Sequence, residues 1–560
     1  MDKIKVFALG GLDEDGRDCY VVEINSDIFV IEAGTCLPDK NIPGIDFMLP
    51  NVDYLIENKN RIKAYIMTHG HDESIGALPY FYNRAPAPIY CTNATKVVIE
   101  AITSTLHINV DYDFVLVNAT DNLEISGHVI HFFQTCHNFA YSFGVAIETD
   151  QGNVVFSGDF VINYDSNDQG YAFDSTALSR ISNKPTLLLM AESKAANKPG
   201  YCSPHHRITG IISKYFTDMK KRIFITCFYQ NLFRIREICL LARKTNKKIY
   251  FYNKYTKNVM SEYLMIQPDL ILPTDIISRE NLLRIPREDV VILMLGSGGE
   301  LYDEIKLLSE GNNEDRRVLI DDSDVFISAA IGRPSLETME TRAIDSIYRT
   351  GATVCWINNK MVSAMHAHED DLKALLSWLR PKFYMPVRGH FVNMMANAKL
   401  ALSTGLGFNH FNILLVDNGC ELIFDGGTRP IVRPQEVTGI PVSPALVDGL
   451  GVATKANEAL VEERIKMGID GVIIIAATID KEHTQIIAGP DCQMRGFVFV
   501  KDAEPLLKTI SSYYLEEVNA VFSGINESFD VAINNIIERT SRYVLRETGR
   551  EPVIMPLIIE

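Results

Sequence analysis

The sequence has no long hydrophobic run. No apolar stretch approaches the roughly 20 residues that a helix needs to span a bilayer, and the N-terminal MDKIKVFALGG lacks the cationic and apolar regions of a signal peptide. The 10 cysteines form no C-x-x-C pair, and most of them sit in apolar runs, as reduced core thiols do. We therefore expect a cytoplasmic protein with no membrane partner.

Positive charge is also scarce. The chain has 54 Lys and Arg against 71 Asp and Glu, which gives a formal net charge of −17. Because phosphate backbones are held by Lys and Arg, this balance argues against a generic polyanion binder. If RNA is the ligand, it must bind in a local basic channel on an acidic body, which net charge alone does not exclude.

The order of the predicted elements indicates an α/β protein. The 560 residues suffice for several domains, and no internal repeat appears. Three β-branched, apolar runs before residue 34 predict an antiparallel meander, and the mixed strand and helix patterns that follow favour a layered sandwich. From Thr186, helices alternate with short buried strands, as in a parallel sheet with crossover helices. Residues 426–444, rich in Gly and Pro, predict a linker to a small α+β domain.

The most informative stretch is Thr68-His69-Gly70-His71, which follows a short apolar run. Two histidines at positions i and i+2, on a loop that leaves a buried strand, can turn both imidazoles toward one point, as zinc ligands do. The alternative is a polar turn with two exposed histidines. The glycine between the rings and the acidic pair Asp72-Glu73 behind them fit a metal loop better.

This loop resembles the H-x-H-x-D-H signature of the metallo-β-lactamase-fold hydrolases, in the form seen in ribonuclease J. The resemblance implies a complete first metal set from three histidines and one carboxylate, of which Asp159 would also bridge to a second metal: His69, His71, His137 and Asp159. For His137 alone, a surface histidine would be about as plausible. The ordered series, with each residue at a strand end, favours the ligand interpretation.

The second metal set of the family is altered in this sequence. Its positions are occupied by Glu73, Ser74, Asp159 and Arg388. Glu73 could still coordinate, serine is a poor neutral ligand, and arginine offers only donors and stays protonated. We expect the Arg388 guanidinium to replace the metal and to pair with Asp159, Glu73 or both. A solvated surface arginine is the alternative, and rescue of the site by His390 is a weaker one. The expected cofactor is one zinc or manganese ion per chain, or none.

The resemblance extends to the inserted β-CASP domain. It implies catalytic roles for Asp159, Glu192 and His366, where the histidine acts on the leaving group. The substrate phosphate would lie near Ser297, Gly298, Ala364 and His366. Ala364 and Val362 stand where the family has a serine and a histidine that contact the scissile phosphate. Glu32 stands where the family has an aspartate that orients a metal-binding histidine.

The expected fold is a metallo-β-lactamase αββα sandwich with an inserted β-CASP α/β domain and a small C-terminal α+β domain. The first part would span 1–195, the β-CASP domain 196–350, the return segment 351–428, the linker 429–450 and the C-terminal assembly domain 451–560.

Three functions follow from the resemblance. The first is a ribonuclease J-like protein of bacterial mRNA decay and rRNA maturation, which binds single-stranded RNA, has weak or lost catalysis and acts in a homo- or hetero-oligomer with an active ribonuclease J paralogue. The second is a competent metal-dependent 5′→3′ exonuclease and endonuclease. The third is a mononuclear hydrolase of a small substrate. The altered second set favours the first, because phosphoryl transfer relies on metals at both the attacking and the leaving oxygens.

Overall fold

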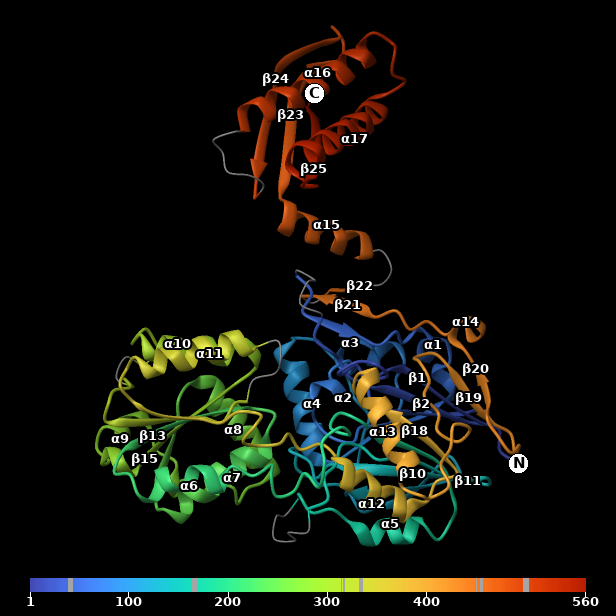
Figure 1. Ribbon diagram of the computed structural model, residues 1–560, viewed down its shortest axis with the longest axis vertical. Coiled ribbons are helices and arrows are strands. Elements are labelled where there is room, and N and C mark those ends of the chain that lie inside the picture. Colours follow the sequence, from blue (N-terminus) through green and yellow to red (C-terminus); the bar gives the residue numbers. More distant parts are fainter. Residues whose placement is uncertain are drawn as a thin grey trace. The chain divides into compact units, whose positions relative to one another are not determined.

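The computed structural model describes residues 1–38, 44–163, 170–313, 315, 318–331, 336–449, 451–453, 457–496 and 503–559 (Figure 1). The contacts divide the chain into two units. The first comprises Met1–Cys36 and Met48–Pro444, and the second comprises Leu37–Phe47 and Ala445–Glu560.

Two mixed sheets form the first body of the larger unit. The eight-stranded sheet has the order β20 (Ile431–Arg433), β19 (Glu421–Phe424), β1 (Ile4–Gly10), β2 (Cys19–Ile24), β3 (Asp27–Ile31), β5 (Ile62–Ile66), β6 (Ile89–Cys91) and β7 (Phe114–Leu116). The six-stranded sheet has the order β18 (Phe383–Val387), β12 (Thr186–Glu192), β11 (Gly152–Phe156), β10 (Phe143–Thr149), β9 (His128–Gln134) and β8 (Asn122–Ile125). The predicted meander is confirmed, because β1, β2 and β3 pair antiparallel in sequence.

The main core lies between these two sheets. Side chains from both sheets form one buried cluster, which includes Val22, Phe29, Val145 and Met190. The opposite face of the six-stranded sheet packs on α5 (Ser175–Ile181), α12 (Glu369–Leu379) and α13 (Phe391–Ser403) through a second apolar cluster. The eight-stranded sheet is accompanied by α1 (Asp53–Glu57), α2 (Asp72–Ile75), α3 (Leu78–Phe81) and α4 (Asn93–Thr105). The expected αββα sandwich is thus confirmed.

The inserted domain is built on a five-stranded parallel sheet. Its order is β14 (Lys248–Phe251), β15 (Val290–Gly296), β13 (Arg222–Phe228), β16 (Asp324–Ser328) and β17 (Thr353–Trp356). Helices cover both faces, with α6 (Thr209–Thr217) and α7 (Leu232–Lys244) on one side and α10 (Gly298–Ser309) and α11 (Glu337–Tyr348) on the other (Figure 1). Two further helices are α8 (Lys254–Ile266) and α9 (Arg279–Leu282).

The exit from the inserted sheet comes later than the sequence pattern indicated. The predicted return segment begins at 351, but β17 completes the inserted sheet and pairs with β16. A short apolar strand after a crossover helix has the same sequence pattern in either sheet, so periodicity alone did not separate them.

The expected linker region contains short elements, namely β20, α14 (Gln435–Thr438) and β21 (Ala445–Asp448), and its last position, 450, lies outside the described residues. The smaller unit holds β21, β22 (Gly451–Ala453) and α15 (Asn457–Asp470). A three-stranded sheet follows, in the order β24 (Gln485–Arg495), β23 (Val472–Asp480) and β25 (Val553–Ile559). One face of this sheet packs on α16 (Ala503–Phe522) and α17 (Phe529–Thr548). Within the described part of the chain, we find no helix that combines the length and the hydropathy of a membrane span.

Candidate metal centre

The sheet topology brings the expected site residues to one edge of the sandwich. In the six-stranded sheet, β9, β11, β12 and β18 run in the same direction, because β10 is antiparallel to both β9 and β11 while β12 and β18 continue parallel. Their carboxyl ends therefore meet at one edge. His137, Asp159, Glu192 and Arg388 lie at or just beyond those ends, and the loop after β5 supplies His69 and His71.

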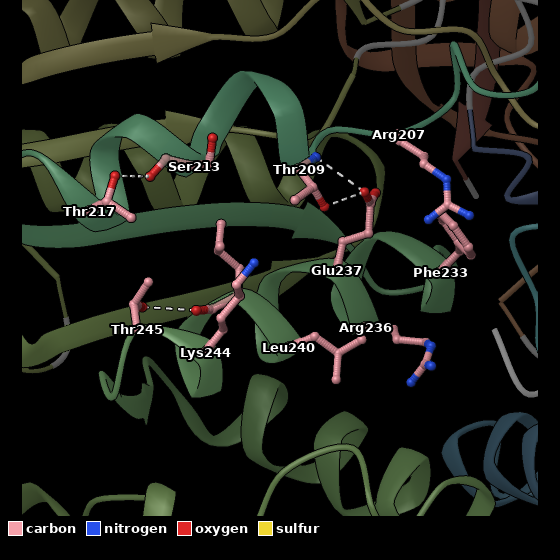
Figure 2. A pocket seen from close by; sticks show the side chains of 11 residues that line it. Arg207, Thr209, Ser213, Thr217, Phe233, Arg236, Glu237, Leu240, Lys244 and Thr245 are labelled. Carbon is pink, nitrogen blue, oxygen red and sulfur yellow. Dashed lines mark hydrogen bonds between the residues drawn. The ribbon is translucent and has the colours of Figure 1, made fainter. Parts of the chain in front are cut away.

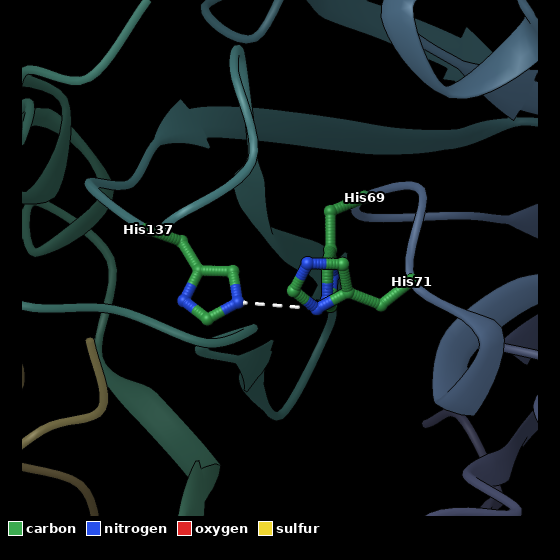
Figure 3. A group of neighbouring side chains, drawn as sticks. All are labelled: His69, His71 and His137. Atoms are coloured by element: carbon green, nitrogen blue, oxygen red, sulfur yellow. Dashed lines mark hydrogen bonds between the residues drawn. The ribbon is translucent and has the colours of Figure 1, made fainter. Parts of the chain in front are cut away.

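Three imidazoles converge at this edge (Figure 3). The ring centroids of His69, His71 and His137 lie 4.7–5.0 Å apart. His137 Nε2 is 3.4 Å from His71 Nδ1, and the ligand atoms of the three rings all fall within 4.8 Å of one another. His69 and His137 are fully buried, and burial holds the pKa of both rings well below the ordinary value. Neutral imidazole is the form that binds a metal.

The nitrogen of each ring that faces away from the centre meets an oxygen. His69 Nδ1 lies 2.9 Å from Thr68 Oγ1, His71 Nε2 lies 3.2 Å from the Gln230 carbonyl, and His137 Nδ1 lies 2.7 Å from the Met365 carbonyl. A ring that donates its outer N–H to such an oxygen keeps the lone pair of its inner nitrogen for a metal. All three rings are therefore oriented as ligands.

Glu32 completes the support of His69. The Thr68 hydroxyl donates to Glu32 Oε1, so the carboxylate acts on the ring through that hydroxyl. Burial raises the pKa of Glu32 to about 8, although the charge of Arg388 opposes this shift. The residue stands near the position expected from the resemblance, but it reaches the histidine through an intervening side chain.

Asp159 supplies the carboxylate. Its Oδ2 is buried and has no hydrogen-bond partner among the described residues, yet it lies 3.7 Å from His69 Nε2 and 3.6 Å from His137 Nε2. Burial alone would raise the pKa of Asp159, but the charge of Arg388 holds it well below the usual range. A charged oxygen aimed at imidazole nitrogens is a donor set suited to a transition metal. These residues could hold one metal ion.

Arg388 is fully buried and lies on the other side of Asp159. Its Nη1 is 2.8 Å from Asp159 Oδ1, and its Nη2 is 2.5 Å from Asp18 Oδ2 and 3.1 Å from Ser74 Oγ. The residue adopts a left-handed backbone conformation, with φ of +61°. Strained backbone of this kind persists where the surroundings fix the side chain. The sequence led us to expect Asp159, Glu73 or both as partners of Arg388. The structure pairs Arg388 with Asp159.

Glu73 lies against different side chains. Its Oε1 is 3.7 Å from His71 Nδ1 and 3.4 Å from Lys194 Nζ, and Lys194 also pairs with Asp15 at 2.9 Å. Sequence reasoning missed Asp18 and Lys194, because neither belongs to a recognisable motif. Burial raises the pKa of Asp18 to about 7, against the opposing charges of Arg388 and Lys194. His390, the weaker alternative ligand, is exposed at the start of α13.

His366 and Glu192 form a second pair beside the histidine cluster. His366 Nδ1 is 2.7 Å from Glu192 Oε2 and 3.8 Å from Asp159 Oδ2. Burial would lower the pKa of His366, but the charges of Glu192 and Asp159 outweigh it and raise the pKa. The other Glu192 oxygen accepts from the backbone N–H groups of Phe160 and Ala367, so the carboxylate is fixed on both sides.

The remaining phosphate-contact candidates occupy two places. Ala364 is exposed and Val362 is buried in the segment that leads to His366. Ser297 and Gly298 lie at the N-terminus of α10 in the inserted domain, where Gly298 has φ of +46°. Backbone N–H groups at such an end could receive a phosphate.

A separate groove of about 370 Å³ runs between α6 and α7 of the inserted domain (Figure 2). Its lining combines apolar and basic side chains, among them Phe233, Leu240, Arg207, Arg236 and Lys244. No histidine or aspartate of the candidate metal centre lines it.

Comparison with known proteins gives the family. Residues 12–206 match the metallo-beta-lactamase superfamily, residues 220–347 match the ribonuclease J beta-CASP domain, and residues 459–560 match the ribonuclease J C-terminal domain. The chain is similar to Ribonuclease J2 of Bacillus subtilis, at 29% identity over 100% of this chain and 99% of that protein. It is also similar to Ribonuclease J 2 of Staphylococcus epidermidis, at 28% identity over 100% of this chain and 98% of that protein.

Among solved structures, the fold is shared with a protein of unknown function from Enterococcus faecalis V583. The TM-score is 0.52 at 14% sequence identity, over 75% of this chain and 100% of that one. The order of the three matched domains, together with relatives that match from end to end, shows that this chain belongs to the ribonuclease J family.

Proposed function

We propose that this chain is a ribonuclease J-like protein of bacterial mRNA decay and rRNA maturation that binds single-stranded RNA with weak or lost catalysis of its own. In this proposal it works in the cytoplasm with an active ribonuclease J paralogue. The names of its relatives, Ribonuclease J2 and Ribonuclease J 2, support the RNA substrate class.

The proposal of weak or lost catalysis rests on the Arg388 guanidinium. It lies against Asp159, Asp18 and Ser74, and two of these, Asp159 and Ser74, stand at positions of the second metal set. A guanidinium has no acceptor and keeps its charge, so it repels a cation from the same space. We therefore assign Arg388 as the replacement of the second metal. Losing one charge-stabilising group in other enzymes costs about 100- to 1,000-fold in rate.

His69, His71, His137 and Asp159 would hold one zinc or manganese ion, with Glu73 as a weaker additional ligand. A bound metal of this kind polarises a phosphate oxygen and activates water. His366 would give a proton to the leaving oxygen, since its ring is held by Glu192 Oε2 at 2.7 Å. Ser297, Gly298 and Ala364 would face the phosphates of the RNA.

Two other functions compete with this one. The paired Glu192 and His366 favour a competent 5′→3′ exonuclease and endonuclease, because that pair would be idle in a protein that only binds RNA. A mononuclear hydrolase of a small substrate has less support. Neither the inserted domain nor the C-terminal domain is needed for a small substrate.

Assembly is supported by the sheet of the smaller unit. Met555, Leu557 and Ile559 of β25 are 43–51% exposed, and Ile474 of β23 pairs with Met555 in register on the same face. The opposite face is the one packed on α16 and α17. An apolar sheet face of this kind suits contact with a second chain. We therefore propose a homo- or hetero-oligomer that uses this face.

Metal content and nuclease activity test the proposal together. After dialysis, elemental analysis of the purified protein should give one metal equivalent per chain or none. On 5′-monophosphorylated RNA with zinc, magnesium or manganese, its rate should fall at least about 100-fold below that of the active paralogue. Two stable equivalents with a rate near that of the paralogue would establish the competent nuclease instead.

A further inference from the structure

One short segment of the inserted domain touches both metal loops of the first body. It comprises residues 229–233, between β13 and the first turn of α7, and we call it the Gln230 segment. It lies far along the chain from the loops that carry His71 and His137. The segment and both metal loops belong to the larger unit.

Four hydrogen bonds join the Gln230 segment to those loops. Its Gln230 carbonyl lies 3.2 Å from His71 Nε2, and the Phe233 N–H donates to the Asn138 carbonyl, next to His137, at 3.0 Å. The Gln230 side chain donates from Nε2 to Asp72 Oδ2 at 2.6 Å, and the Tyr229 hydroxyl donates to the same oxygen at 3.3 Å. Two side chains of the segment thus donate to the same carboxylate oxygen of Asp72.

Asp72 is well placed to anchor the segment because its own backbone is fixed. It is the first residue of α2, directly after His71, and its carbonyl accepts from the N–H groups of Thr35 and Gly76 at 2.8 and 2.9 Å. The carboxylate therefore has little freedom relative to the His71 ring. Holding the Gln230 side chain also holds the Gln230 carbonyl, which is the acceptor for His71 Nε2.

We propose that Asp72 is a positioning residue that fastens the Gln230 segment over the metal loop and so fixes the orientation of His71. The chain of contacts runs from Asp72 to Gln230 and from the Gln230 carbonyl to the outer nitrogen of His71, whose inner Nδ1 faces His137. Outer contacts of this kind typically contribute about 10- to 100-fold to metal affinity.

The coupling is reciprocal. If docking of the Gln230 segment tightens metal binding, metal binding must stabilise the docked segment by the same factor. The inserted domain and the metal centre are then linked through a few residues. The inference rests on the proposed metal set, but it holds whether or not the chain cleaves RNA.

Metal affinity of the full-length protein tests the role. Affinity for Zn²⁺ is measured by competition with a chromogenic chelator for wild type, Asp72→Ala, Gln230→Ala and the double variant. Each single variant should bind about 10- to 100-fold more weakly. The double variant should bind Zn²⁺ only slightly more weakly than the single variant that has the lower affinity, because both changes break the same connection. Asp72→Asn keeps an acceptor for Gln230 Nε2 and should recover much of the loss.

The matched control is Asp345→Ala, which removes an exposed carboxylate of α11 that pairs with Arg349. It should leave Zn²⁺ affinity unchanged. The absorption spectrum of bound Co²⁺, which reports the ligand geometry, should change in Asp72→Ala and stay as in wild type in the control. Tyr229→Phe, a milder change that removes one of the two donors to Asp72, covers the case in which the alanine variants fold poorly.

Hydrogen exchange supplies the reciprocal measurement. Zn²⁺ should slow amide exchange in residues 229–233 of wild type, and this protection should be reduced in Asp72→Ala. Unchanged Zn²⁺ affinity in both single variants would overturn the inference, as would strictly additive losses in the double variant. A wild-type protein that binds neither Zn²⁺ nor Mn²⁺ would overturn it too, and would separately refute the proposed metal set.

Discussion

Arg388 and Asp159 face each other in a fully buried ion pair, with Nη1 2.8 Å from Oδ1 and neither side chain exposed to solvent. Asp18 lies at the other guanidinium nitrogen, and its side chain is equally buried. A buried pair of this kind does not by itself guarantee stability, but removal of one partner leaves an uncompensated charge in a medium that solvates it poorly.

Arg388→Met should therefore destabilise the metal-free protein. The expected loss in the free energy of unfolding is about 3–5 kcal/mol, because the buried carboxyl groups of Asp159 and Asp18 lose the cation that compensates them. Urea denaturation in the presence of a chelator measures it. Arg388→Met with Asp159→Asn should recover part of the loss, and an equal or larger loss in that double variant would contradict the pairing described here.

Restoring the second metal set should restore a second metal. The triple variant Glu73→Asp, Ser74→His and Arg388→His supplies the ligands that the family has at those positions, and removes the guanidinium that repels a cation. Elemental analysis after dialysis should find more than one equivalent of zinc or manganese, against one or none in wild type. The variant with only Glu73→Asp and Ser74→His is the control, since Arg388 is still present and should keep the content at one or below.

Charges on the outer face of the C-terminal sheet should dissociate the proposed oligomer. Met555→Asp with Leu557→Asp places two carboxylates among exposed apolar side chains without touching the buried face of β25. Sedimentation velocity should show a smaller species than wild type at equal concentration. Leu283→Asp changes an apolar residue that is 68% exposed in the inserted domain, and it should sediment as wild type. Unchanged sedimentation of the double variant would argue against this face.

Mild acid should destabilise the protein partly through His206. This ring is 1% exposed, and burial lowers its pKa to about 3, with a further contribution from the charge of Arg207. Above pH 6.5 the His206 ring is mostly neutral in both the folded and the unfolded chain. As pH falls from 6.5 toward 3, the unfolded chain binds a proton that the folded chain does not, so the free energy of unfolding decreases. Between pH 7 and 5 the loss from this residue is about 2 kcal/mol. Urea titrations at both values should show a smaller loss for His206→Asn than for wild type.

Much of the candidate metal centre was predictable from the family resemblance, because its residues lie in short motifs at strand ends. His69 and His71 share one loop, and His137, Asp159 and Arg388 each follow a strand whose direction brings it to the same edge. The pairing of Arg388 with Asp159 followed from the resemblance and from charge together, since the resemblance places a cation among carboxylates.

Asp18, Lys194 and Gln230 were not predictable in the same way. Gln230 reaches His71 across 159 positions of sequence through a backbone carbonyl, which any residue type would offer. Asp18 has no motif around it, and its importance comes only from burial beside Arg388. The end of the inserted sheet was missed for a related reason, because β17 has the same short apolar sequence pattern that a strand of the sandwich would have.

The positive charge beside Asp159 is covalently attached to the chain. A metal ion at that place would exchange with solution, and its presence would depend on free metal concentration and on competing chelators. Arg388 cannot dissociate, and at 0% exposure it cannot be displaced without unfolding its surroundings. This half of the site therefore carries the guanidinium charge in every folded molecule, regardless of metal supply.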